Sequence, residues 1–277
     1  MTLIDRCLDQ TSTEVSDILL EKGYFLLKNL FTQNDVQRLK SAADEALNNF
    51  KEKEGKINNN SIFINNAFLY NNIFLEVVSN EYICQIVEKS IGERITLTNS
   101  SLANVTLIEG NDSGGVFGGT WHTDSRYVQR GKVRLNHGFS YLVIICIDDF
   151  KDQNSSTKFV NGSHLFNEKP ERVLNEKLYE IKRIDGKAGD VFILDSGIWH
   201  KAGEPTQGSR WGLISYYTPW YFKPYYRFSE MFDKEQIKLF TDRQINLMHL
   251  TTTPPISQFE RMNTYITPES FRNNLDK

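Results

Sequence analysis

The residues that most constrain this fold are two histidines and one aspartate that lie far apart in the chain. His122 and Asp124 are two positions apart, and His200 follows 200 − 124 = 76 residues later. Residues two apart on an extended segment project to the same face, so one imidazole and one carboxylate could reach the same ion. A gap of 76 residues suits two strands that face each other across a barrel better than one local loop. The spacing therefore predicts a metal site built on strands.

The sequence around the second histidine also predicts strands. A Gly-Asp turn at residues 189–190 precedes an apolar run that ends shortly before His200. Arg210 begins a second strand-like run at residues 210–217, after a turn-rich segment. Two imidazoles and one carboxylate are the ligands of the facial triad, which leaves coordination positions open on non-haem Fe(II). An arginine lining the same cavity could hold the carboxylate of a co-substrate bidentately.

Each of these residues alone has a plainer interpretation. The chain contains five histidines, and a single histidine is more often a surface or hydrogen-bonded residue than a metal ligand. The ordered combination favours the metal site: His-x-Asp follows a Gly-rich segment, a strand leads to His200, and Arg210 comes 210 − 200 = 10 positions later.

Four blocks of the chain occur in an order that is known from one enzyme family. The blocks are a strand and helix from residue 21, the metal motif at 121–124, the pair Asp148-Asp149 followed by residues 160–164, and residues 189–210. Together they resemble the phytanoyl-CoA dioxygenase family of Fe(II)/2-oxoglutarate oxygenases, over about residues 15–255. Asn161 stands where proline is usual in the third block.

The resemblance implies a mainly β protein with flanking helices, folded as a double-stranded β-helix or jelly roll. It also implies that His122, Asp124 and His200 bind Fe(II), with 2-oxoglutarate and O2 as co-substrates. Arg210 would then pair with the distal carboxylate of 2-oxoglutarate.

The chain departs from the family next to this carboxylate. A serine commonly lies two residues after the second metal histidine, but this chain has Ala202 there. Another hydroxyl must then assist, or Arg210 acts alone. Thr157 and Asn104 are candidates for further co-substrate contacts, and an ordinary strand hydroxyl and a strand-edge amide remain open as alternatives.

Asp124 distinguishes between reactions within the family. Members that halogenate lack this carboxylate, so its presence implies hydroxylation or a related two-electron oxidation, with release of succinate and CO2. The cofactor supplies the difficult step, and the protein supplies placement and shielding. The alternatives are a jelly-roll domain that only binds a ligand, a metal enzyme that uses no 2-oxo acid, and a hydroxylase of proteins or peptides.

Length and pattern predict one domain in the 277 residues, because β-barrels of about 200–250 residues routinely form one. We expect a jelly-roll core at about residues 95–220, between N-terminal supporting helices at about 12–91 and a C-terminal lid or packing segment at about 221–277. Amphipathic patterns predict helices at residues 12–22, 32–49 and 81–91, with an exposed loop at 50–60.

Charge and cysteine content limit the partners. The net charge of −3 gives no general reason to expect binding to nucleic acid or membranes. The three cysteines, Cys7, Cys84 and Cys146, show no paired spacing, so a disulfide framework is not expected. No signal-peptide pattern or membrane-spanning apolar segment is present in the sequence. We therefore expect a cytoplasmic enzyme that acts on a small molecule, with its oligomeric state open.

Three segments are candidates for contact with substrate. The Gly-rich residues 110–119 suit a mobile flap or a plain hairpin connection. The basic residues 126–134, beginning with Arg126, could receive an anionic group, although a charged hairpin edge is the simpler interpretation. The aromatic residues 216–226 could cover the barrel mouth or complete the core. Of these we expect Trp220 and Tyr221 to lie nearest the pocket.

Overall fold

The computed structural model describes most of the chain. The described residues are 11–54, 61–106, 120–124, 138–166, 168–204, 206–252, 257–258 and 267–275. Within these ranges, none of the helices combines the length and the apolar character that a bilayer crossing requires.

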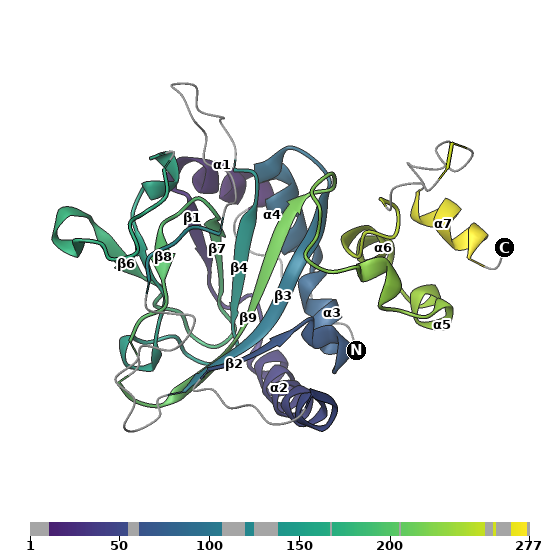
Figure 1. Ribbon diagram of the computed structural model, residues 1–277, viewed down its shortest axis with the longest axis horizontal. Coiled ribbons are helices and arrows are strands. Elements are labelled where there is room, and N and C mark those ends of the chain that lie inside the picture. Colours follow the sequence, from purple (N-terminus) through teal and green to yellow (C-terminus); the bar gives the residue numbers. More distant parts are fainter. Residues whose placement is uncertain are drawn as a thin grey trace.

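A six-stranded antiparallel sheet forms the centre of the molecule, in the order β1-β7-β4-β9-β3-β2 (Figure 1). Its strands are β1 (Tyr24–Leu27), β2 (Ser61–Asn65), β3 (Ile95–Thr106), β4 (Tyr141–Cys146), β7 (Val191–Asp195) and β9 (Ser209–Pro219). The central strand β4 pairs with β7 on one side and with β9 on the other. The sheet thus places the strand that leads toward His200 close to the strand that contains Arg210.

A smaller sheet packs against one face of the large one. It has the order β6-β5-β8 and consists of β5 (Lys158–Val160), β6 (Ile181–Arg183) and β8 (His200–Lys201). Phe159 of β5 and Phe192 of β7 meet with ring centroids 5.5 Å apart. A buried apolar cluster fills the space between the sheets and includes Leu142, Ile144 and Cys146 of β4.

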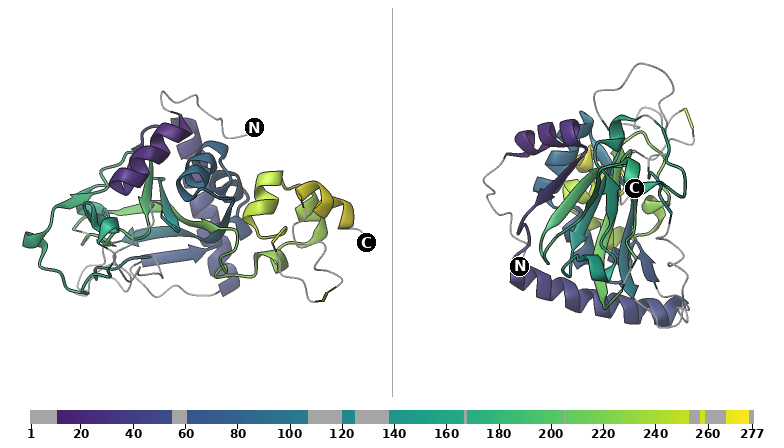
Figure 2. Two further views of the ribbon diagram at one scale, coloured as in Figure 1. Left: turned by 90° about the horizontal axis from the view of Figure 1, so that it is seen from above. Right: turned by 90° about the vertical axis from the view of Figure 1, so that its left-hand side faces the viewer.

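Helices cover the other face of the large sheet. They are α1 (Ser12–Lys22), α2 (Gln33–Glu54), α3 (Ile73–Val78) and α4 (Glu81–Ile91). Figure 2 shows α1 and α4 over the sheet and the long α2 along its lower edge. Tyr141, Val143 and Ile145 of β4 face these helices and belong to the larger apolar cluster. Both faces of β4 are therefore buried, which explains its continuous apolar sequence.

Local signals account for the predicted helix ends. Thr11 and Glu14 form a capping box at the start of α1, and Gly23 ends the helix in the left-handed conformation with φ of 78°. The expected loop at residues 50–60 is wrong for its first part, because α2 continues to Glu54. The ring of Phe50 packs on Tyr70 with centroids 5.6 Å apart, and this tertiary contact extends the helix.

The N-terminal segment contributes strands as well as helices. β1 pairs with β7, and β2 pairs with β3, so both edges of the large sheet come from residues before 91. β1 agrees with the strand expected from about residue 21, whereas β2 lies in a segment for which only helices and a loop were expected. Short 3₁₀ turns lie at Ala67–Leu69, Asp152–Asn154, Ser163–Leu165, Glu176–Leu178 and Phe228–Glu230.

The C-terminal part packs at the end of the molecule opposite the small sheet. It contains α5 (Lys234–Lys238), α6 (Asp242–Leu247) and α7 (Pro268–Asn274), which Figure 1 shows on the side away from β6. Arg243 of α6 binds the carboxylates of Glu81 and Glu88 on α4. The imidazole Nε2 of His249 donates to the main-chain oxygen of Leu97 at 3.0 Å. These contacts fasten residues 242–249 to the helices and to β3.

His249 gives the fold a measurable dependence on pH. Burial lowers its pKa from 6.5 to about 4, although the hydrogen bond to Leu97 acts in the opposite direction. The unfolded chain therefore binds a proton between these values that the folded chain does not, and stability falls as the pH drops through this window. Between about pH 7.5 and about pH 5 the loss attributable to His249 is about 2 kcal/mol.

The variant His249→Asn, which suits the positive φ of 59° at this position, is expected to lack this contribution. Urea unfolding of both proteins at the two pH values measures how much the free energy of unfolding changes with pH in each. The contributions of all other titratable groups are the same in both proteins and cancel in the comparison. Parallel pH profiles would contradict the assignment.

Candidate metal centre

The three predicted metal ligands converge at the junction of two segments. His122 and His200 form an antiparallel bridge in which each main-chain N–H donates to the other's carbonyl, at 3.0 and 2.9 Å. Nε2 of His200 lies 3.3 Å from Oδ2 of Asp124, and Nε2 of His122 lies 3.8 Å from Oδ1. One ligand atom from each residue lies within 4.8 Å of the others. The gap of 76 residues is closed by pairing of the two extended segments.

The main chain fixes which nitrogen of each imidazole points toward the carboxylate. Nδ1 of His122 lies 2.9 Å from the carbonyl of Thr120, and Nδ1 of His200 lies 2.9 Å from that of Ile198. A carbonyl oxygen only accepts, so both Nδ1 atoms bear the proton. The lone pair of each Nε2 is then free to bind a metal, and a partner on the opposite nitrogen is the usual arrangement for metal-bound histidine.

Charge coupling keeps the carboxylate ionised. Burial acts to raise the pKa of Asp124, but the neighbouring His200 and His122 lower it below its usual value. Burial likewise acts to lower the pKa of His200, but Asp124 raises it. The pKa of His122 is lowered by burial and by the proximity of His200. A divalent cation bound to Asp124 and to Nε2 of His200 would compete with protonation of His200.

The arrangement fits one divalent transition metal with positions left open. Two imidazole nitrogens and one carboxylate oxygen are the donor set of the facial triad. The side chain of His200 is only 7% exposed, whereas those of His122 and Asp124 are 41% and 30% exposed. The more exposed side of the site is therefore the side of His122 and Asp124.

Arg210 lies buried near the start of β9, with only part of its hydrogen-bonding capacity used. Its Nη2 donates to the main-chain oxygen of Ser155 at 2.7 Å, and its guanidinium carbon lies 3.8 Å from the centroid of the Phe150 ring. The buried atoms Nε and Nη1 have no hydrogen-bond partner among the described residues. Burial lowers the pKa of Arg210 to about 10. A buried cation with unpartnered N–H groups fits a carboxylate ligand.

Gly212 leaves room beside this guanidinium. A Cβ at this position would come within 2.8 Å of Cζ of Phe150 and within 3.6 Å of Nη1 of Arg210. The absence of a side chain therefore allows the Phe150 ring to lie against Arg210. This is one place where the strand needs a glycine for close packing.

A family model establishes the relationship of this chain. The model of the phytanoyl-CoA dioxygenase family matches residues 19–212, more than half of the chain, and includes the three ligands and Arg210. The chain belongs to the phytanoyl-CoA dioxygenase family. A comparison with curated proteins gave no significant match.

Solved structures of similar fold are Fe/2-oxoglutarate enzymes. The alpha ketoglutarate dependent carbocyclase SnoK from nogalamycin biosynthesis has a TM-score of 0.58 and 16% identity, covering 76% of this chain and 86% of that one. The epimerase SnoN of the same biosynthesis has a TM-score of 0.59 and 15% identity, covering 75% and 83%. HygX from Streptomyces hygroscopicus, with nickel, 2-oxoglutarate and hygromycin B bound, has a TM-score of 0.56 and 14% identity, covering 77% and 89%. At these identities the likeness shows a shared fold.

Thr157 lies just before β5, on the face of the small sheet that points toward the large sheet. The pairing of β5 with β8 extends to the residues just before β5, because the main-chain N–H of Gly203 donates to the carbonyl of Ser156. Thr157 is therefore extended and points to the same face as Phe159, between the two sheets. It is two residues from Ser155, whose carbonyl binds Arg210. The hydroxyls of Ser155 and Ser156 donate to main-chain carbonyls, of Gly203 and Ile184 respectively.

Asn104 lies on the face of the sheet opposite Arg210. Asn104 pairs with Trp211, whereas Arg210 pairs with Val105. Directly paired residues point to the same face, and neighbours along a strand point to opposite faces. Trp211 belongs to the apolar cluster under the helices. The expectation that Asn104 contacts the co-substrate is therefore corrected.

The predicted substrate contacts have different outcomes. Arg126 and the Gly-rich segment at 110–119 lie outside the described residues. Trp220 lies beyond the end of β9, where its main-chain N–H donates to the carbonyl of Arg94 and its ring lies 5.4 Å from the Arg94 guanidinium carbon. Tyr221 is 57% exposed and packs edge-on against Trp220. Both lie near the end of β9 that is farther from Arg210.

Tyr216 of the aromatic segment contacts the metal motif directly. Its hydroxyl donates to the main-chain oxygen of Asp124 at 2.8 Å. Sequence reasoning grouped it with the lid or core aromatics. A usable signal was present, because Tyr216 lies six residues after Arg210 on one strand, and an even spacing places both on one face.

Proposed function

We propose that this protein is an Fe(II)- and 2-oxoglutarate-dependent dioxygenase that hydroxylates a small organic molecule and releases succinate and CO2. The main support is the convergence of His122, Asp124 and His200, together with a buried Arg210 whose Nε and Nη1 have no hydrogen-bond partner among the residues that the structure describes. The family relationship agrees with this proposal. We interpret the two facing antiparallel sheets as a double-stranded β-helix and the whole chain as one catalytic domain.

The residues of the chain have distinct roles in this proposal. His122, Asp124 and His200 would hold Fe(II), and Arg210 would hold the distal carboxylate of 2-oxoglutarate, with the Thr157 hydroxyl as a second donor. The bound iron, 2-oxoglutarate and O2 supply the oxidising chemistry. The protein orients the co-substrate against the metal, and the apolar cluster between the sheets, which includes Ile144 and Phe192, excludes water from the buried side.

The proposed substrate is a small metabolite that enters from the exposed side of His122. SnoN has been crystallised with nogalamycin RO, and HygX with hygromycin B, so proteins of this fold accept bulky small molecules. Hydroxylation is our proposal for the outcome, because the Asp124 carboxylate occupies the place that halogenating relatives leave vacant. We place the enzyme in the cytoplasm, where reducing conditions maintain Fe(II).

Anaerobic addition of Fe(II) and 2-oxoglutarate to the purified protein is expected to produce the metal-to-ligand charge-transfer absorption of a chelated 2-oxo acid. Admission of O2 with ascorbate is then expected to yield succinate, slowly alone and faster with a substrate from a metabolite library. Charge-transfer absorption without succinate in any mixture would indicate a protein that only binds its ligands. Failure of both measurements with metal-loaded protein would contradict the proposed function.

A further inference from the structure

We infer that Tyr216 is a positioning residue for the metal centre, which it serves by holding the main chain of Asp124. The inference rests on the proposed function only in that the three-residue site must bind a metal. The His122–His200 bridge fixes the metal motif two residues before Asp124. The Tyr216 hydroxyl holds the other end of this segment through the Asp124 carbonyl, at 2.8 Å.

Hydrogen-bond directions order the Tyr216 hydroxyl. The Asp124 carbonyl can only accept, so Tyr216 donates its single proton there. Its oxygen must then accept from the Ser140 hydroxyl, which lies 3.0 Å away. The Ser140 hydroxyl is also in a short hydrogen bond with the Ser196 hydroxyl, and Ser196 donates to the main-chain oxygen of Ser140 at 3.0 Å. The three hydroxyls thus form a hydrogen-bonded chain whose last step, from Tyr216, ends on the metal motif.

Each member of this chain belongs to rigid structure. Tyr216 is on β9 and is 9% exposed, Ser140 directly precedes β4, and Ser196 directly follows β7. β9 carries Arg210 near its start, and six residues further along it carries Tyr216, which binds the main chain of Asp124. A single strand sets the positions of the co-substrate carboxylate and of one metal ligand relative to each other.

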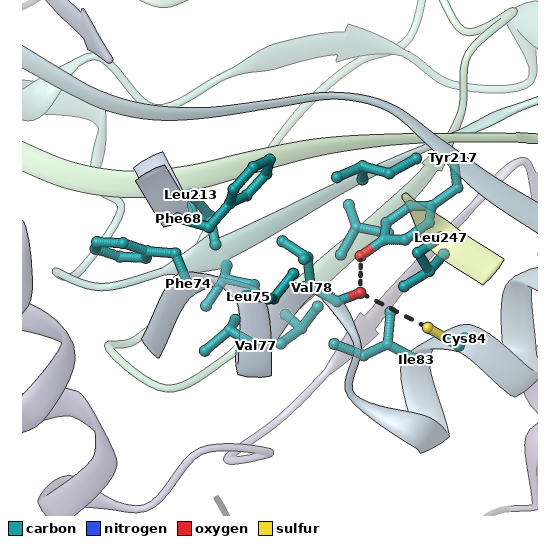
Figure 3. Packing of buried hydrophobic residues seen from close by; sticks show 14 of the residues in the cluster. Phe68, Phe74, Leu75, Val77, Val78, Ile83, Cys84, Leu213, Tyr217 and Leu247 are labelled. Atoms are coloured by element: carbon teal, nitrogen blue, oxygen red, sulfur yellow. Dashed lines mark hydrogen bonds between the residues drawn. The ribbon is translucent and has the colours of Figure 1, made fainter. Parts of the chain in front are cut away.

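The neighbouring Tyr217 provides a matched control on the opposite face of the same strand. Its hydroxyl donates to the main-chain oxygen of Val78 at 2.7 Å, and Figure 3 shows this contact among the apolar side chains of the helical face. Tyr217 is 1% exposed. Tyr216→Phe and Tyr217→Phe each remove one buried hydroxyl that donates to a main-chain carbonyl. They differ in whether that carbonyl belongs to a metal ligand.

The inference is tested by titrating the protein with Mn(II) alone. The electron paramagnetic resonance signal of the free ion measures how much Mn(II) is bound, and no catalytic turnover is needed. Tyr216→Phe is expected to weaken Mn(II) binding about tenfold, because the Asp124 carbonyl loses its buried donor. Tyr217→Phe is expected to bind Mn(II) as the unchanged protein does. Both variants should lose similar resistance to urea.

A second, milder variant is Ser140→Ala, which removes the donor that orders Tyr216 and is expected to weaken Mn(II) binding about threefold. Equal Mn(II) affinities of Tyr216→Phe and Tyr217→Phe, or an unchanged affinity in both Tyr216→Phe and Ser140→Ala, would overturn the inference. Absence of Mn(II) binding by the unchanged protein would instead refute the metal site itself.

Discussion

Replacing His200 with alanine is expected to weaken metal binding more than about 100-fold, because loss of a ligand should exceed the effect of losing a supporting contact. Succinate formation should fall to background. The main-chain bridge to His122 uses the N–H and carbonyl of residue 200 and survives the substitution. Mn(II) titration and succinate assays measure the two effects.

His249→Ala is the control for this substitution. His249 is also a buried histidine with a ring nitrogen hydrogen-bonded to a main-chain carbonyl, but it lies against Phe228 in the C-terminal part. The control should lose stability and keep its metal affinity. If both histidine variants bind Mn(II) equally well, the ligand assignment of His200 is wrong.

Replacing Arg210 with methionine is expected to reduce the affinity for 2-oxoglutarate about 100-fold, since charge-assisted hydrogen bonds to a buried carboxylate are lost. The affinity for Mn(II) should not change. Arg210→Lys should recover only part of the affinity, because an ammonium group cannot reproduce the planar set of donors. Isothermal titration of the metal-loaded protein with 2-oxoglutarate separates the two ligands.

The same substitution has a second expected effect on stability. Arg210 is a buried cation with two nitrogens that have no hydrogen-bond partner within the described part of the chain, so without 2-oxoglutarate methionine should stabilise the folded protein by on the order of 1 kcal/mol. Added 2-oxoglutarate should raise the melting temperature of the original protein and not that of the variant. Arg243→Met is the control, because it removes a guanidinium that is bound to Glu81 and Glu88. This variant should be less stable than the original protein, and 2-oxoglutarate should still raise its melting temperature.

Much of the architecture was predictable from local sequence patterns. The helices α1 and α4 follow from capping residues and apolar spacing, and their ends match the expectation at Ser12–Lys22 and Glu81–Ile91. β4 follows from its uninterrupted apolar run, because a strand buried on both faces needs apolar residues at every position. The convergence of His122, Asp124 and His200 was predictable because ligand chemistry restricts both the residue types and the short spacing in His122-x-Asp124.

Contacts between distant segments decided the rest. α2 extends to Glu54, 54 − 49 = 5 residues beyond its expected end, and Phe50 in this extension meets Tyr70. The edge strand β2 exists because residues 61–65 find β3 as a partner. An isolated edge segment has no pattern strong enough to predict it, since its stability comes from the neighbour with which it pairs.

The sequence by itself determined which residues could bind a metal and a carboxylate: His122, Asp124, His200 and Arg210 have the donor chemistry and the strand-compatible spacing. Only the tertiary structure decided which other residues face them. β3 has a register irregularity between Leu97 and Asn99, and its pairing then turns Asn104 toward the helices. A shift of one residue in register exchanges the two faces of a strand, and the register is set by packing across the whole sheet. The contact between Tyr216 and Asp124 depends on a second pairing, because β9 must lie beside β4 before the Tyr216 hydroxyl can meet the metal motif.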